Sequence, residues 1–235
     1  MVDVRLFFGG PRREQHAQLL EKCKEHISLS RALLHGPSCQ KTSLLFQYAY
    51  NEAQQNHKVV YFGKRQKLDA QPPVFSEGLV TDNQVLHRIN IKYIEDHRSL
   101  KSYLAHVHLL PASDIPHLLL VDDLSCLILP GRERHDRTSS VAGTLAFLQD
   151  AADFLSTALQ SVHPGAQCKV IVADQPVQEQ LLSIYQRWLP LVLSVKGTNP
   201  YELNCPWGSL HYSSLGDSIR LEDVHYSAPR SVWET

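Results

Sequence analysis

Residues 31–50 read RALLHGPSCQKTSLLFQYAY, and their pattern indicates the class of fold. A short apolar run is followed by a turn of glycine, proline and serine, then by Lys41 and Thr42, then by an amphipathic segment. This order predicts a strand, a phosphate-binding loop and a helix, in which backbone N–H groups and the positive helix end converge on phosphate oxygens. In such a loop the Lys41 ammonium contacts phosphates and the Thr42 hydroxyl ligates Mg²⁺.

The loop departs from the usual pattern G-x-x-x-x-G-K-[ST]. Its two glycine positions hold His35 and Gln40, and the glycine that is present, Gly36, lies one residue inside. If His35 and Gln40 take positive φ angles, each costs about 1–2 kcal/mol, and about 1.4 kcal/mol is tenfold in affinity. We therefore expect weak nucleotide binding, or binding that needs a partner. The residues predicted to line the nucleotide are His35, Gly36, Pro37, Ser38, Cys39, Gln40, Lys41, Thr42 and Ser43.

Composition favours one soluble unit inside the cell. The 235 residues with 43% hydrophobic content can bury one substantial core. A net charge of −1 argues against a generally basic nucleic-acid binder, so contact with DNA would need a local patch. The five cysteines contain no C-x-x-C pair, which fits a reducing compartment. The longest apolar runs, such as 189–195, are too short to span a bilayer, so we predict no membrane association and a cytosolic or nuclear location.

Apolar runs and helical stripes alternate along the chain. Strands are expected at 58–64, 85–94, 118–121, 168–174 and 191–195, and helices at 12–27, 100–107, 139–159 and 176–188. The stretch 64–73 is polar and contains proline, so we expect it to be irregular. This alternation predicts an α/β fold with a mainly parallel sheet. We divide the chain into an N-terminal helical arm (1–30), a core (31–196) and a C-terminal β-hairpin segment that completes the sheet (197–235).

The apolar run LLLV at 118–121 ends in two carboxylates, Asp122 and Asp123. In a P-loop protein, a buried strand that ends in an aspartate lies beside the phosphate loop and holds Mg²⁺ through water. We therefore predict Asp122 as the partner of Thr42 at a metal site, and a simple strand-end carboxylate is the alternative. Asp123 is the only nearby candidate for polarising an attacking water.

The order of motifs from Leu118 to Val177 resembles the RecA-type recombinase ATPases and their paralogues. These motifs are LLLVDD, a Gly/Arg loop, a long helix and VIVADQPV. More narrowly, the chain is similar to the ATPase-like subunits that pair with a SWIM-domain protein in the vertebrate Shu complex. The likeness covers about 31–195. It implies a RecA-like P-loop NTPase core, whose mainly parallel sheet is flanked by helices, with a C-terminal antiparallel β segment.

The resemblance also implies roles for individual residues. ATP and Mg²⁺ would be the cofactors, and Gln175 would join Asp123 in catalysis as the glutamine that senses the γ-phosphate and links it to DNA. The family's water-activating glutamate follows the strand after the P-loop helix, where this chain has Gly63, Lys64 and Arg65. The site is therefore expected to bind ATP with at most weak, DNA-stimulated hydrolysis.

For DNA, the resemblance places the first binding loop where Arg132, Arg134 and Arg137 fall. Lys64 and Arg65, with Lys67 as an extension, would add to this basic patch. Phosphate contacts from such residues bind single-stranded DNA without sequence preference and with strong salt dependence. Acidic residues within the loop dilute the patch, so a solvated surface turn is the alternative. The second DNA loop of the family is replaced by the helix expected at 176–188.

The partners implied by the resemblance are a zinc-binding SWIM-domain protein in a heterodimer, a RecA-type recombinase with its paralogues, and single-stranded DNA. The implied role is accessory, in homologous-recombination DNA repair in the nucleus, where the pair would promote or stabilise recombinase filaments. Two other functions stay open from the residues alone. One is a free-standing P-loop kinase or NTPase acting on a small molecule, and the other is a catalytically dead scaffold.

Overall fold

A computed structural model describes residues 2–9, 29–37, 39–128, 134–175 and 177–227. The helix predicted at 12–27 lies outside the described residues. Residues near the start of the chain nevertheless belong to the core, because Val2, Val4, Phe7 and Phe8 are buried around the short 3₁₀ helix η1 (Val4–Phe7).

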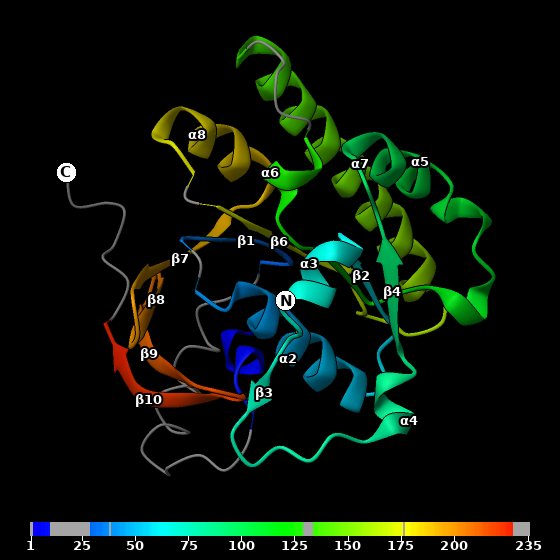
Figure 1. The fold of residues 1–235 in the computed structure, drawn as a ribbon. Coiled ribbons are helices and arrows are strands. Elements are labelled where there is room, and N and C mark those ends of the chain that lie inside the picture. Colours follow the sequence, from blue (N-terminus) through cyan, green and yellow to red (C-terminus); the bar gives the residue numbers. More distant parts are fainter. Residues whose placement is uncertain (1, 10–28, 38, 129–133, 176, 228–235) are drawn as a thin grey trace.

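The described residues form one ten-stranded sheet (Figure 1). Its strand order is β3-β10-β9-β8-β7-β1-β6-β5-β2-β4. The strands are β1 (Arg31–His35), β2 (Val59–Gly63), β3 (Phe75–Ser76), β4 (Ile89–Tyr93), β5 (Leu118–Val121), β6 (Lys169–Asp174), β7 (Leu191–Gly197), β8 (Tyr201–Cys205), β9 (Gly208–Leu215) and β10 (Ser218–Tyr226).

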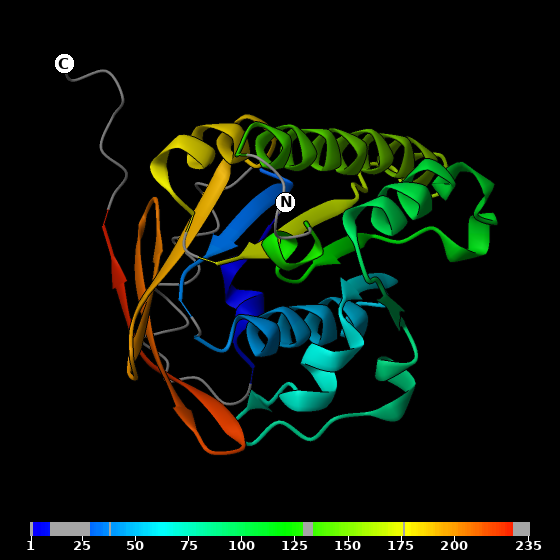
Figure 2. The same cartoon turned by 45° about the horizontal axis from the view of Figure 1, so that its top comes forward.

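The strands from β7 through β1, β6, β5 and β2 to β4 pair in parallel. Helices cover both faces of this part (Figure 2), which explains why β2 and β5 are buried throughout and apolar without alternation. The helices are α2 (Lys41–Gln54), α3 (Arg65–Ala70), α4 (Asn83–Leu86), α5 (His97–Ala105), α6 (Leu124–Leu127), α7 (Arg134–Gln160) and α8 (Glu179–Trp188), with short 3₁₀ helices η2 (Val107–Leu109) and η3 (Ala112–Asp114).

Side chains of alternate strand residues pack into two separate apolar clusters. Tyr61 faces the cluster that contains α2 and η1, whereas Val60 and Phe62 face the cluster that contains α5, α7 and α8. At the other end of the sheet, β7, β8, β9 and β10 pair antiparallel. The predicted α/β fold, with a mainly parallel sheet and a C-terminal antiparallel segment, is confirmed.

The structure differs from the expected elements in two places. The strand predicted at 85–94 is shorter, because the Asp82 carboxylate accepts a hydrogen bond from Gln84 N–H and begins the helical turn α4 before β4. The stretch expected to be irregular after β2 forms the short helix α3, which is anchored by a single buried residue, Leu68. No helix in the described part of the chain is both long and apolar enough to cross a membrane.

Candidate nucleotide site

The predicted phosphate loop joins β1 to α2 at the carboxyl ends of the parallel strands. At Gly36 a Cβ atom would lie 2.5 Å from the Val195 carbonyl oxygen, so only glycine allows the loop to approach β7 this closely. Gln40 has φ 58° and ψ 25°, the left-handed conformation in which a glycine is favoured. His35 ends β1 and has no positive φ. The strain expected from replacing the two glycines therefore applies at Gln40 and not at His35, while Ser38 lies outside the described residues.

The Lys41 side chain folds back over this loop. Its Nζ donates to the carbonyl oxygen of Gly36 at 2.6 Å and to that of Pro37, and lies 3.9 Å from Cys39 Sγ. Burial lowers the pKa of Lys41 from its ordinary value. Burial also raises the pKa of the Cys39 thiol and lowers that of His35, so both side chains favour their neutral forms. The Lys41 ammonium is thus the charge that this loop contributes.

Thr42 and Asp122 are brought into direct contact from positions 80 residues apart. Thr42 Oγ1 donates to Asp122 Oδ2 at 2.8 Å, and the Tyr61 hydroxyl donates to the same oxygen at 2.7 Å. Asp122 is 3% exposed. The loop and the end of β5 therefore meet as the sequence predicted, and Tyr61 is a further residue of the site that the sequence did not indicate.

Lys67 of α3 is the second residue that sequence reasoning missed at this site. Its Nζ lies 2.9 Å from Asp122 Oδ1 and 3.3 Å from Asp123 Oδ2. Burial alone would lower the pKa of Lys67, but the charges of Asp122 and Asp123 outweigh burial and raise it. Lys67 therefore pairs with the carboxylates rather than extending a DNA-binding patch. The available signal was the basic run directly after β2, where the RecA-type family has an acid.

Asp123 and Gln175 are also in contact. Gln175 Nε2 donates to Asp123 Oδ2 at 3.0 Å, so this oxygen accepts from both Gln175 and Lys67. Burial would raise the pKa of Asp123, but the Lys67 charge and the Gln175 hydrogen bond lower it below its ordinary value. Asp123 Oδ1 is buried without a hydrogen-bond partner among the described residues. The carboxylate thus stays ionised and is held against Lys67.

Asp174 fixes the end of β6, from which Gln175 projects. The carboxylate of Asp174 accepts from the backbone N–H groups of Ser125 and Gln175, at 3.0 and 2.8 Å, and from the hydroxyl of Tyr185. Asp174 is 1% exposed. Through these two hydrogen bonds from backbone N–H groups, the Asp174 carboxylate connects the start of α6 to Gln175.

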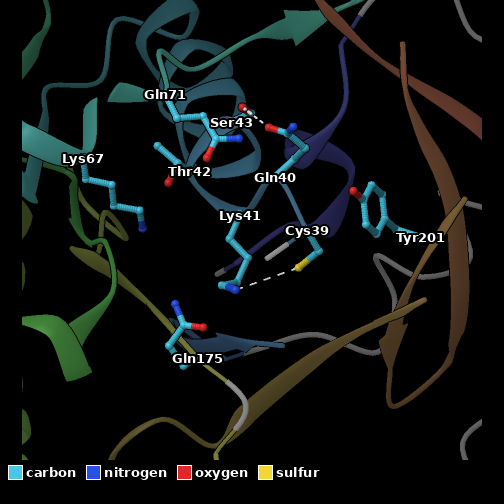
Figure 3. A pocket seen from close by; sticks show the side chains of 9 residues that line it. All are labelled: Cys39, Gln40, Lys41, Thr42, Ser43, Lys67, Gln71, Gln175 and Tyr201. Carbon is cyan, nitrogen blue, oxygen red and sulfur yellow. Dashed lines mark hydrogen bonds between the residues drawn. The ribbon is translucent and has the colours of Figure 1, made fainter. Parts of the chain in front are cut away.

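Several residues of the site, from the phosphate loop, α3 and the end of β6, line one pocket (Figure 3). Its lining residues are Cys39, Gln40, Lys41, Thr42, Ser43, Lys67, Gln71, Gln175 and Tyr201. The cavity is about 140 Å³, smaller than the roughly 300–1,000 Å³ of sites that enclose a whole small molecule. It is therefore too small to enclose a whole nucleotide.

The fit of Mg²⁺ can be judged from the oxygen atoms present. The Thr42 hydroxyl and the Asp122 carboxylate are ligands of the kind that Mg²⁺ prefers. However, the two oxygens of Asp122 already accept from Thr42, Tyr61 and Lys67, and neither Asp122 nor Asp123 lines the pocket. Among the described residues, no group of three or more His, Cys, Asp or Glu side chains is arranged to hold a metal. As arranged, the site does not fit Mg²⁺ unless Lys67 moves.

The predicted DNA-binding residues lie on separate elements. Arg132 is outside the described residues, and Arg134 begins α7. Arg137 is exposed and lines a groove between α7 and α8. Lys64 precedes α3 and Arg65 begins it, with the Arg65 guanidinium 5.3 Å from the centre of the Tyr93 ring. A single basic surface that joins these residues therefore stays a prediction.

The order of these parts is that of a RecA-type recombinase paralogue, the class of protein that the fold and the site indicate. No protein-family model matches the chain. The chain is 30% identical over 164 residues to ATPase SWSAP1 of Homo sapiens, and the match covers 67% of this chain and 67% of that protein. The chain therefore belongs to the family of ATPase SWSAP1. The resemblance to RecA-type paralogues is confirmed.

Proposed function

We propose that the chain is an ATP-binding accessory subunit in homologous-recombination DNA repair, acting in the nucleus. The observation that carries this proposal is the contact between Thr42 and Asp122, because it joins the phosphate loop to the carboxylate strand. Membership in the family of an ATPase supports nucleotide binding. The size and basic lining of the pocket favour the phosphates as the part that is held.

ATP binding would replace the present contacts of Lys41. In the free protein its ammonium rests on the neutral carbonyl groups of Gly36 and Pro37. A phosphate oxygen is a charged acceptor, and charge-assisted hydrogen bonds are the stronger ones. The ammonium would therefore transfer to the phosphates, which also face the N-terminus of α2.

Hydrolysis would be slow. Phosphoryl transfer depends on a group that orients the attacking water, and the residues after β2 are Gly63, Lys64 and Arg65 rather than an acid. Asp123 already accepts hydrogen bonds from Lys67 and Gln175. We propose weak, DNA-stimulated ATPase activity at most, in which Asp123 and Gln175 couple the phosphates to DNA.

The proposed partners follow from the family. They are a zinc-binding SWIM-domain protein, which would form a heterodimer with this chain, and a RecA-type recombinase with its paralogues. The pair would promote or stabilise recombinase filaments on single-stranded DNA.

Contact with single-stranded DNA would come from the basic side chains of Arg132, Arg134, Arg137, Lys64 and Arg65. Lysine and arginine contacts to phosphates make affinity fall steeply with salt. Replacing Arg132, Arg134 and Arg137 together by Glu should abolish binding of a labelled single strand by the chain or its complex. Binding that is unchanged in the triple variant would refute the assignment.

The overall proposal is tested by purifying the chain from cells, identifying the stoichiometric partner and measuring ATP binding by that complex. A SWIM-domain partner together with ATP binding that depends on Lys41 supports the proposal. A different partner overturns the proposal, and phosphorylation of a small molecule by the chain overturns it in favour of a kinase. A partner without ATP binding indicates a catalytically dead scaffold.

A further inference from the structure

We propose that the Lys67 ammonium takes the place of the divalent cation in this site, so that the chain binds the phosphates of ATP between two lysines with little dependence on Mg²⁺. The inference rests on the proposed ATP binding and specifies the cation that accompanies it.

The Lys67 ammonium lies beside both carboxylates at the end of β5. Lys67 Nζ lies 2.9 Å from Asp122 Oδ1 and 3.3 Å from Asp123 Oδ2, so it bridges both carboxylates at the end of β5. Asp122 in turn accepts from the Thr42 hydroxyl. A metal held by Thr42 and Asp122 would lie close to this ammonium. Because like charges at short range in a partly buried site repel strongly, the ammonium and the metal compete for the same place.

The two carboxylates that hold the Lys67 ammonium are buried. The carboxyl side chains of Asp122 and Asp123 are 1% and 5% exposed, and that of Lys67 is 32% exposed. Buried carboxylates that lose their counter-charge are costly. Lys67 is covalently attached to α3, so its single positive charge offsets part of their negative charge without the cost of removing water from Mg²⁺, which dehydrates reluctantly. The tethered cation is therefore favoured over a free ion.

The pocket presents two lysine side chains to a ligand. Lys41 and Lys67 both line it, and neither Asp122 nor Asp123 does. Figure 3 shows the two side chains extending into the pocket from α2 and from α3. A triphosphate that enters would meet two ammonium groups and the amide of Gln175. Two ammonium groups and an amide would thus contact the phosphate oxygens directly, a contact that Mg²⁺ makes in other P-loop sites.

The proposal is tested by measuring ATP affinity of the full chain, or of its complex with the co-purifying partner, in Mg²⁺ and in EDTA. For the wild type we expect the two affinities to agree within about threefold, and for Lys67→Met we expect Mg²⁺ to strengthen binding by more than about tenfold. Lys67→Arg keeps the charge and should behave like the wild type. Lys58→Met is a matched control, because Lys58 pairs with exposed Asp114 outside the pocket. A wild type that depends on Mg²⁺ as strongly as Lys67→Met overturns the proposal.

A second measurement uses the metal alone. Electron paramagnetic resonance of Mn²⁺ should detect no bound ion on the wild-type chain without nucleotide and one bound ion on Lys67→Met. A bound ion on the wild type that is lost in Asp122→Asn overturns the inference about Lys67. If neither protein binds ATP, the proposed ATP binding fails, and the Mn²⁺ result still decides whether Lys67 occupies the cation position.

Discussion

Lys41 and Lys67 line the same pocket, but the protein holds them in opposite ways. Lys41 contacts two backbone carbonyl oxygens, and burial lowers its pKa. Lys67 contacts two buried carboxylates, whose charges outweigh burial and raise its pKa. Both residues are lysines, so the groups that each ammonium contacts, and not the residue type, set their different roles. Lys41 would exchange two neutral carbonyl partners for a charged phosphate, whereas Lys67 would contact phosphate while still paired with the carboxylates.

The largest expected effect is a loss of stability when a carboxylate that contacts Lys67 is removed. Asp122→Ala removes the acceptor of Thr42 and Tyr61 and leaves Lys67 with one carboxylate. We expect the free energy of unfolding, measured by denaturant titration, to fall by about 3 kcal/mol. Asp69→Ala is the control, because its ion pair with Arg65 is exposed, and it should cost no more than about 0.5 kcal/mol. Equal losses in both variants would mean that the carboxylate cluster is not held as described.

The next effect is the pH dependence of ATP affinity. The pKa of Lys41 in the free protein lies below its ordinary value of 10.5, and only the ammonium form binds phosphate well. Affinity should therefore be full below that pKa and fall as the pH rises through it, by up to about tenfold per pH unit. The pKa of Lys67 is raised, so Lys67 stays charged over this range. Equilibrium titrations at several alkaline pH values measure this decline. The Lys67→Met variant should show the same decline in ATP affinity. A wild-type affinity that does not change with pH would contradict the assignment of this decline to Lys41.

The smallest effect concerns strain in the loop. Gln40 has φ 58°, so Gln40→Gly removes a left-handed non-glycine residue. Glycine loses more conformational entropy on folding than other residues, and this offsets part of the relief of strain. We therefore expect the free energy of unfolding to rise by less than about 1 kcal/mol, with ATP affinity equal or higher. Asn56→Gly is matched, because Asn56 has φ 62° but follows α2 away from the pocket, and it should leave ATP affinity unchanged. A loss of stability in Gln40→Gly would show that its contact with the Ser43 hydroxyl at 3.1 Å matters more than strain.

Much of the fold was predictable because its strands are buried on both faces. Residues 118–121 and 170–173 are continuous apolar runs for that reason, and the carboxyl ends of parallel strands meet at one edge of the sheet. This geometry brings Thr42, Asp122 and Gln175 into one region, as the sequence predicted.

The contacts of Lys67 with the carboxylates could not be predicted in the same way. Helix α3 has six residues and only one buried side chain, Leu68, so it carries no hydrophobic periodicity. The ion pair from Lys67 to Asp122 joins residues 55 positions apart, and a local pattern contains no information on such a contact. The sequence did show that basic residues replace the family's acid after β2. Only the fold shows that Lys67 turns toward the carboxylates.

Phosphate binding by the loop after β1 is tested most directly by equilibrium binding of ATP to the wild-type chain and to Lys41→Ala, in complex with the co-purifying partner. Loss of a charge-assisted contact of about 1.5–3 kcal/mol predicts that Lys41→Ala binds about 10- to 100-fold more weakly. Circular dichroism of both proteins checks that the fold is kept. Equal affinity of the wild type and Lys41→Ala would contradict the claim that the loop after β1 holds the phosphates.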